Sequence, residues 1–140
     1  MGRCFFWRQA QGFGGKVFAK LGAVPQQIAG GDIYPAMERG TLDACEWVGP
    51  YDDEKLGFYK VAKHYYYPGF WEPGPNISFY VSKKEWDKLP AEYKAAFEAA
   101  AAEANLSMQA EYDAKNPVAL VSLLQKGTKL HLYPADVMKA

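Results

Sequence analysis

The chain has 140 residues, an apolar fraction of 49%, and sixteen basic side chains balanced by sixteen acidic ones. This length allows one domain that buries ~68–70% of its unfolded surface, and the apolar fraction argues against disorder. Nucleic acid is excluded as a natural partner because phosphate binding needs a net basic face. No apolar run approaches the ~20 residues that a membrane-spanning helix needs.

The first fifty residues predict an alternation of strands and helices. Apolar and β-prone stretches indicate strands, and glycines mark the C-terminal ends of both helices. The predicted order is a strand over 4–8, a helix over 16–22, a strand over 26–29, a helix over 33–40 and a strand over 42–48. Because strands that alternate with helices form crossover units, this order favours an α/β fold.

The middle of the chain begins with a turn at Gly49-Pro50. It predicts a helix over 54–62, then an aromatic and proline-rich strand edge and bent loop over 64–75. Residues 76–83 alternate well, with Ile77, Phe79 and Val81 on one side, and therefore predict a strand.

The last third is rich in the strongest helix formers and predicts a long helix over 90–126, after a short helix over 83–90. Pro117 lacks an amide donor and should kink this helix or start a new one. At ~1.5 Å per residue the run reaches ~55 Å, which exceeds the width of a compact domain of this size. We therefore expect it to pack on something else. A closing strand is predicted over 128–134.

Several patterns argue against a catalytic or zinc-binding protein. The GFGGK stretch at 12–16 matches neither glycine-rich phosphate motif, so a tight strand-to-helix turn explains it. His64 and His131 stand far apart in sequence without neighbouring ligands, and Cys4 and Cys45 form no CxxC pattern. With no nucleophile-and-base arrangement, an enzyme is not expected.

Glu46 and Trp47, at the end of the apolar stretch LDACEWV, allow two interpretations. One is an exposed edge acid beside an aromatic ring that packs. The other is a strand-end acid that reaches a ligand crevice at the carboxyl edge of the sheet. Glu72 follows Phe70-Trp71 in a similar aromatic setting. Two buried carboxylates brought together would repel unless a cation lay between them.

The motifs DA-x-EW-VGPYDD at 43–53 and YYYPG-x-WEPGP at 65–75 are the most specific features of the chain. The sequence from Gly12 to about Leu130 closely resembles the solute-binding proteins of tripartite ATP-independent periplasmic (TRAP) transporters, in the branch that captures 2-oxo acids and related carboxylates. The resemblance implies an α/β fold: one lobe of a periplasmic-binding-protein-like fold with a long C-terminal helix.

The resemblance also implies a set of site residues. Glu46, Glu72 and the Trp47 carbonyl would hold a cation that bridges the protein and the ligand carboxylate. Hard oxygen ligands of this kind suit sodium or calcium better than zinc. The ring of Trp47, together with Tyr67 and Trp71, would wall the ligand pocket.

The chain departs from the family pattern near its start. The family's carboxylate-clamping arginine aligns with Gln9, and the nearest arginine is Arg8. A one-residue shift on a strand reverses the face on which a side chain lies, whereas a bulge would restore Arg8 to the ligand. Residues 1–11 are therefore either divergent or unrelated to the family.

The second departure is length, because the family's proteins are more than twice as long. The 140 residues are interpreted as a single truncated domain without the first lobe. The family acts in the periplasm with a TRAP membrane permease. The N-terminus shows no leader pattern, which indicates a cytoplasmic or undetermined location for the chain as encoded.

Two functions follow from these observations. The first is a non-catalytic binding module for a small organic (2-oxo) acid, with binding weakened or altered because a clamp needs both lobes. The second is an oligomeric interaction protein that has lost solute binding. In either case former interdomain apolar surface would be exposed, and we expect a homodimer.

Overall fold

The computed structural model describes residues 3–6, 12–71, 74 and 77–139, with side chains from residue 12 onward. The chain divides into two compact units. The first unit comprises Met1–Pro73 and Asn116–Ala140, and the second comprises Gly74–Lys115. Each unit has its own structure, and the candidate site lies within the first.

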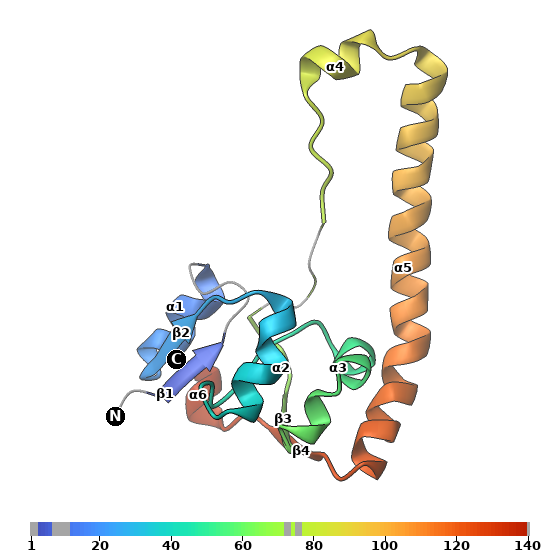
Figure 1. Ribbon diagram of the computed structural model, residues 1–140. Coiled ribbons are helices and arrows are strands. Elements are labelled where there is room, and N and C mark those ends of the chain that lie inside the picture. Colours follow the sequence, from blue (N-terminus) through green and yellow to red (C-terminus); the bar gives the residue numbers. More distant parts are fainter. Residues whose placement is uncertain (1–2, 7–11, 72–73, 75–76, 140) are drawn as a thin grey trace. The chain divides into compact units, whose positions relative to one another are not determined.

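The first unit contains two short parallel sheets (Figure 1). Strand β1 pairs with β2 so that Cys4 lies opposite Val24, and β3 pairs with β4 so that Tyr66 lies opposite His131. Parallel neighbours need a crossover connection, which α1 provides between β1 and β2. The elements in chain order are β1 (Arg3–Phe6), α1 (Phe13–Lys20), β2 (Ala23–Gln26), α2 (Gly30–Glu38), α3 (Pro50–Leu56), the 3-10 helix η1 (Phe58–Lys60), β3 (His64–Tyr67), β4 (Lys129–Leu132) and α6 (Ala135–Lys139).

The core of the first unit forms around α2. Ile33 and Ala36 lie three residues apart and therefore share one face of the helix. They pack with Leu42 and Phe58, and the half-buried Trp47 rests against this cluster. Burial of such side chains supplies most of the favourable free energy of folding.

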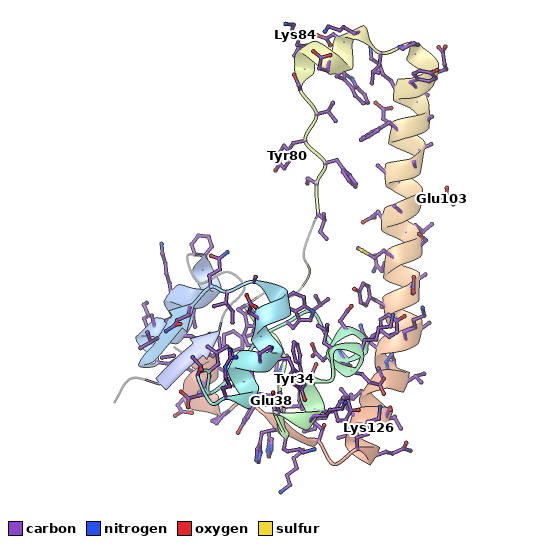
Figure 2. The ribbon with its side chains drawn as sticks, in the orientation of Figure 1. Tyr34, Glu38, Tyr80, Lys84, Glu103 and Lys126 are labelled. Carbon is purple, nitrogen blue, oxygen red and sulfur yellow. The ribbon has the colours of Figure 1, made fainter. Side chains whose placement is uncertain are left out.

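The C-terminal end of helix α5 (Ala91–Gln125) is tied to α3 by polar contacts within the first unit. The side-chain oxygen of Asn116 accepts a hydrogen bond of 3.1 Å from the Tyr51 amide. The Ser122 hydroxyl donates to Glu54 Oε1 at 2.5 Å, and the ammonium of Lys126 (Figure 2) lies 2.6 Å from the same oxygen. These contacts place the end of α5 beside the cavity described below.

The second unit consists of an extended segment over 77–82, helix α4 (Lys83–Lys88) and α5 as far as Lys115. The Phe97 ring meets the Phe79 and Trp86 rings at centroid distances of 6.1 and 5.6 Å. Tyr80 is 94% exposed and projects from the side of the segment away from α5 (Figure 2). The unit leaves much apolar surface uncovered: Ile77, Phe79, Tyr80, Val81, Leu89, Tyr93, Phe97, Leu106 and Met108 are all exposed.

Two of the strand predictions were wrong. Residues 42–48 form no strand beyond an isolated bridge at Ala44, because this segment packs Leu42 into the core instead of pairing along its length. Residues 77–82 are extended, but no strand in the described part of the chain pairs with them. A strand exists only with a hydrogen-bonding neighbour, so alternation alone cannot create one.

Other predicted boundaries were shifted. The second strand is β2 at 23–26 rather than 26–29, because its register with β1 fixes its position. The helix predicted over 54–62 begins at Pro50 and breaks at Gly57, whose φ of 76° is left-handed. The long helix runs without interruption through Pro117, where we had expected a kink or a new start.

Candidate functional site

A cavity of about 640 Å³ opens in the first unit between the segment 43–50, α3, η1, the β3–β4 sheet and the end of α5. Its described walls are strongly aromatic: Trp47, Phe58, Tyr59, Tyr65, Tyr66, Tyr67, Trp71 and Tyr133 all line it. The carboxylates of Asp43, Glu46 and Asp53 line it too, whereas none of the described lining residues is a lysine or arginine. A concave, aromatic cavity with a few polar groups is typical of a small-molecule site.

Glu46 is only 8% exposed although it carries a carboxylate. It lies in the connection between α2 and α3, not at a strand end as the sequence predicted. Burial of a carboxylate is costly unless hydrogen bonds or a positive charge offset it. The exposed edge acid, one of the two interpretations above, is therefore wrong, and Glu46 lies buried at the cavity.

The indole ring of Trp47 lies against the start of α2. A Cβ atom added to Gly30 would lie 2.8 Å from Cη2 of this ring, which is too close for the ring to stay in place. Glycine at this position therefore lets the helix backbone approach the indole. The contact fixes the wall of the cavity that Trp47 provides.

Gly30→Ala should displace the Trp47 ring and lower the free energy of unfolding by about 1–3 kcal/mol, the usual effect of overpacking. Urea unfolding would measure the change. Gly31→Ala is the matched control, because nothing lies within 4 Å of a Cβ there and alanine is favoured over glycine in a helix by roughly 0.5–1 kcal/mol. Equal effects of the two substitutions would contradict the close approach.

Asp53 is the second buried acid of the cavity, at 7% exposure. The Tyr65 hydroxyl donates a 2.5 Å hydrogen bond to Asp53 Oδ2, while Asp53 Oδ1 is buried and has no partner within the described part of the chain. Burial is the main reason that the pKa of Asp53 is raised from 3.8 to about 7; the Tyr65 hydrogen bond opposes the rise, and the charges of Asp52 and Glu46 add to it. Asp53 therefore holds its proton more firmly than an exposed aspartic acid does.

Neighbouring groups respond to the same environment. Burial, with the charges of Asp53 and Glu46, raises the pKa of the Cys45 thiol to about 12, so it stays protonated and unreactive at neutral pH. Burial and the Asp53 charge also raise the pKa of Tyr65, which keeps its hydroxyl a donor. Thr128 Oγ1 is buried at the cavity, and no described residue forms a hydrogen bond with it. None of these groups is arranged as a nucleophile beside a base.

The far wall of the cavity is built by aromatic packing. The Trp71 ring meets Phe18, Phe70 and Tyr133 at centroid distances of 5.3, 5.0 and 5.7 Å, in edge-to-face arrangements. Such contacts stabilise by about 0.5–1.5 kcal/mol each beyond area burial and fix ring orientation. Trp71 is therefore held rigidly by α1, β4 and its own loop.

The structure brings four of the predicted site residues to one cavity: Glu46, Trp47, Tyr67 and Trp71 all line it. Arg8 and Glu72, the predicted carboxylate clamp and second cation ligand, lie outside the described residues. Asp53 and Thr128 were not predicted as site residues. The sequence carries no signal that an oxygen of Asp53 would be buried without a hydrogen-bond partner among the described residues.

The donor set fits a hard cation. Glu46 and Asp53 are both buried, the Glu46 charge contributes to the raised pKa of Asp53, and Asp53 Oδ1 has no hydrogen-bond partner among the residues that the structure describes. Carboxylate oxygens in such an arrangement suit sodium or calcium. Within the described part of the chain, no three His, Cys, Asp or Glu side chains gather closely enough to hold a metal ion by themselves. A cation here would therefore need backbone oxygens, water or ligand oxygens as well.

Comparisons with known proteins agree with this geometry. A monocarboxylate 2-oxoacid-binding periplasmic protein from Nostoc sp. strain PCC 7120 is 53% identical over 129 residues, which cover 92% of this chain and 35% of the relative. The chain thus spans about a third of that relative's length.

Two solved TRAP solute-binding proteins share the fold. One, from Bordetella bronchiseptica RB50, is 52% identical with a TM-score of 0.88, and the match covers 98% of this chain and 40% of the other. It is a mixed-occupancy dimer with copurified calcium and picolinate in a bound active site. The other, from Pseudoalteromonas atlantica T6c, is 37% identical with a TM-score of 0.87, and the match covers 99% of this chain and 41% of the other. It has bound sodium and pyruvate.

These structures confirm the α/β lobe with a long C-terminal helix. No helix in the described ranges has the length and apolar character to cross a bilayer. The sequence profile of the DctP family, described as bacterial extracellular solute-binding protein, family 7, matches residues 8–140. The chain therefore belongs to this family of TRAP transporter solute-binding proteins, whose members are receptors rather than enzymes.

Proposed function

We propose that this chain supplies a lobe that binds a small organic acid of the 2-oxo acid class through a bound cation. The supporting observation is that the cavity gathers buried acids and aromatic rings, with no lysine or arginine among its described lining residues. An anionic ligand would be repelled by Glu46 and Asp53 unless a cation lay between them.

Each site residue has a role in this proposal. Glu46, the Trp47 carbonyl and Glu72 hold sodium or calcium, and the ion binds the ligand carboxylate. Trp47, Tyr67 and Trp71 enclose the apolar part of the ligand, and Arg8 pairs with the carboxylate. The Bordetella and Pseudoalteromonas relatives support this assignment, because each contains such an ion with a carboxylate or 2-oxo acid.

The 140 residues taken alone should bind weakly. Without a second lobe to close over the cavity, its charges would remain accessible to water, and exposed charge interactions contribute only about 0–1 kcal/mol. In a two-lobed protein the same site would work outside the cytoplasmic membrane and deliver its ligand to a TRAP permease. The periplasmic Nostoc relative supports that location.

Thermal unfolding with ligand tests the proposal. Binding to the folded state stabilises it by about 2.7 kcal/mol at a ligand concentration of 100 times Kd. Two acids are compared at millimolar concentration, pyruvate and a bulkier 2-oxo acid, each with and without sodium or calcium. Each acid should raise the melting temperature when the ion is present, and by less without it. An unchanged melting temperature under all four conditions would reject the binding function for this chain.

The uncovered apolar surface of the second unit favours a second function, self-association. The segment 77–82 exposes apolar side chains on both faces and has no paired strand within the described residues. Such edges pair readily with another chain. We propose that two copies associate through this segment and the neighbouring face of α5.

Light scattering at micromolar concentration should therefore show a dimer, and Phe79→Lys should shift it toward monomer because the new charge disfavours burial. Lys84→Ala, on the exposed surface of α4 (Figure 2), is the control and should leave the dimer intact. A monomeric parent chain would contradict self-association and leave the ligand-binding proposal untouched.

A further inference from the structure

The only two histidines of the chain meet on one face of the β3–β4 sheet. His64 Nδ1 lies 2.9 Å from His131 Nε2, and the two rings stack with centroids 5.0 Å apart and an interplanar angle of 24°. In the parallel register, Lys129 lies opposite His64 and Tyr66 lies opposite His131. Residues two apart on a strand share a face, so all four side chains lie on the same side of the sheet.

The position of His131 is fixed by aromatic stacking. The Tyr66 ring stacks on it at 5.0 Å with an angle of 25°, and Tyr66 in turn contacts Tyr133 at 5.4 Å. The pair remains accessible, since the contact between the histidines is exposed. The result is an oriented pair of imidazoles on a surface.

The two facing nitrogens share one hydrogen, so one ring donates and the other accepts. A metal ion binds an imidazole nitrogen at ~2.0–2.1 Å. Two nitrogens bound to one ion at a right angle are therefore ~2.9 Å from each other, whereas two nitrogens at the tetrahedral angle are ~3.4 Å from each other. The observed 2.9 Å is the separation of a hydrogen bond, and it is also short enough for both nitrogens to reach adjacent positions of a square-planar or octahedral site. To do so the two rings, whose nitrogens now face each other with centroids 5.0 Å apart, must turn toward the metal ion. That geometry is typical of Cu(II) and Ni(II).

We propose that His64 and His131 form a surface chelating site for a divalent transition metal, Cu(II) or Ni(II), which takes the place of the shared hydrogen. The ring that carried this hydrogen then carries it on its other nitrogen, so two neutral imidazoles bind without net proton release. No third His, Cys, Asp or Glu joins them among the residues that the structure describes. Water completes the coordination, and the positive charge of Lys129 opposes binding.

This site differs in chemistry from the carboxylate pocket. Its ligands are nitrogens, which suit Cu(II) and Ni(II), whereas Glu46 and its neighbours offer the oxygens that suit sodium or calcium. His64 also borders the cavity, so the experiment must distinguish the two sites by variants as well as by metal.

Calorimetric titration of the full chain, prepared without a histidine tag, with Ni(II) and then Cu(II) tests the proposal. One equivalent should bind, and loss of one of two linked ligands should weaken the affinity by about 100-fold. His131→Phe keeps a ring to stack on Tyr66, and His64→Gln replaces an exposed side chain, so both variants should fold. Circular dichroism melts would verify this.

Two matched controls separate metal ligation from other effects. Lys129→Gln removes the opposing charge and should keep or raise the affinity for Ni(II). Glu46→Gln should leave Ni(II) binding unchanged, whatever it does to calcium and 2-oxo acid binding. The proposal would be overturned if the native chain bound neither Ni(II) nor Cu(II), or if either histidine variant bound the metal as tightly as the native chain.

Discussion

Asp53→Asn should make the fold more stable at pH 8 and leave its stability near pH 4 almost unchanged. The Asp53 carboxyl is buried, one of its oxygens has no partner among the described side chains, and its pKa is raised from 3.8 to about 7, chiefly by burial. Asparagine has nearly the same shape and a carbonyl that can accept the Tyr65 hydroxyl. It removes the buried charge and its repulsion with Glu46.

The sign follows from proton linkage. Between pH 4 and pH 7 the folded chain holds the Asp53 proton while the unfolded chain has lost it, so stability falls as pH rises through this window and is level above it. Each unit of pKa difference corresponds to about 1.4 kcal/mol. The full difference therefore sets an upper limit of roughly 4 kcal/mol on the gain from the substitution at pH 8.

Urea unfolding at pH 4.5 and pH 8 would measure this effect. The buffer should lack divalent ions and sodium, because a cation near Glu46 would favour the charged form of Asp53 and lower its pKa. Asp113→Asn, on the exposed surface of α5, is the control and should not change the pH dependence. An Asp53 variant that keeps the parent's loss of stability between the two pH values would contradict this account.

Glu46→Gln should abolish the ligand-dependent rise in melting temperature. The amide keeps the size of the side chain, but it loses the negative charge that attracts sodium or calcium, and the ligand carboxylate depends on that ion in our proposal. At a ligand concentration of 100 times the native Kd, a stabilisation of about 2.7 kcal/mol would disappear. Titration with calcium alone would show whether the ion or the organic acid is lost first.

Glu38→Gln is the matched control for this variant. Glu38 lies exposed on α2 (Figure 2), outside the cavity lining, so the same loss of charge there should leave the melting shift intact. The Glu46 substitution should also lower the pKa of Asp53, because one of the charges that raises it is removed. An unchanged ligand response in Glu46→Gln would remove this carboxylate from the site.

The sequence predicted Glu46 as a site residue for a partly wrong reason. We placed it at the end of a third strand, but residues 42–48 form no such strand and the acid is buried in a connection instead. Its location in the pocket was predicted from the resemblance of this motif to the family, and not from local structure. Local propensity contains no information about burial of an isolated carboxylate, which depends on neighbours from α3 and β3.

The His64–His131 contact also could not be predicted from local sequence. Sixty-seven residues separate the two rings, and the sequence offered no reason to associate them. Pairing of β3 with β4 brings them together, because register decides which side chains share a face.

The family, the α/β class, a long helix predicted over 90–126 and observed over 91–125, and the aromatic, acid-bearing segments of the pocket could all be predicted from the sequence. These properties depend on local motifs and on helix propensity, and both are set by residues that are close together in the sequence. Three features required the folded structure: the burial of Asp53, the close approach of Gly30 to the Trp47 ring, and the extended form of residues 77–82. Within the described residues, one Asp53 oxygen has no hydrogen-bond partner and no strand pairs with 77–82. The physical reason is that burial, register and strand pairing depend on residues distant in sequence, and their energies arise only when those residues meet.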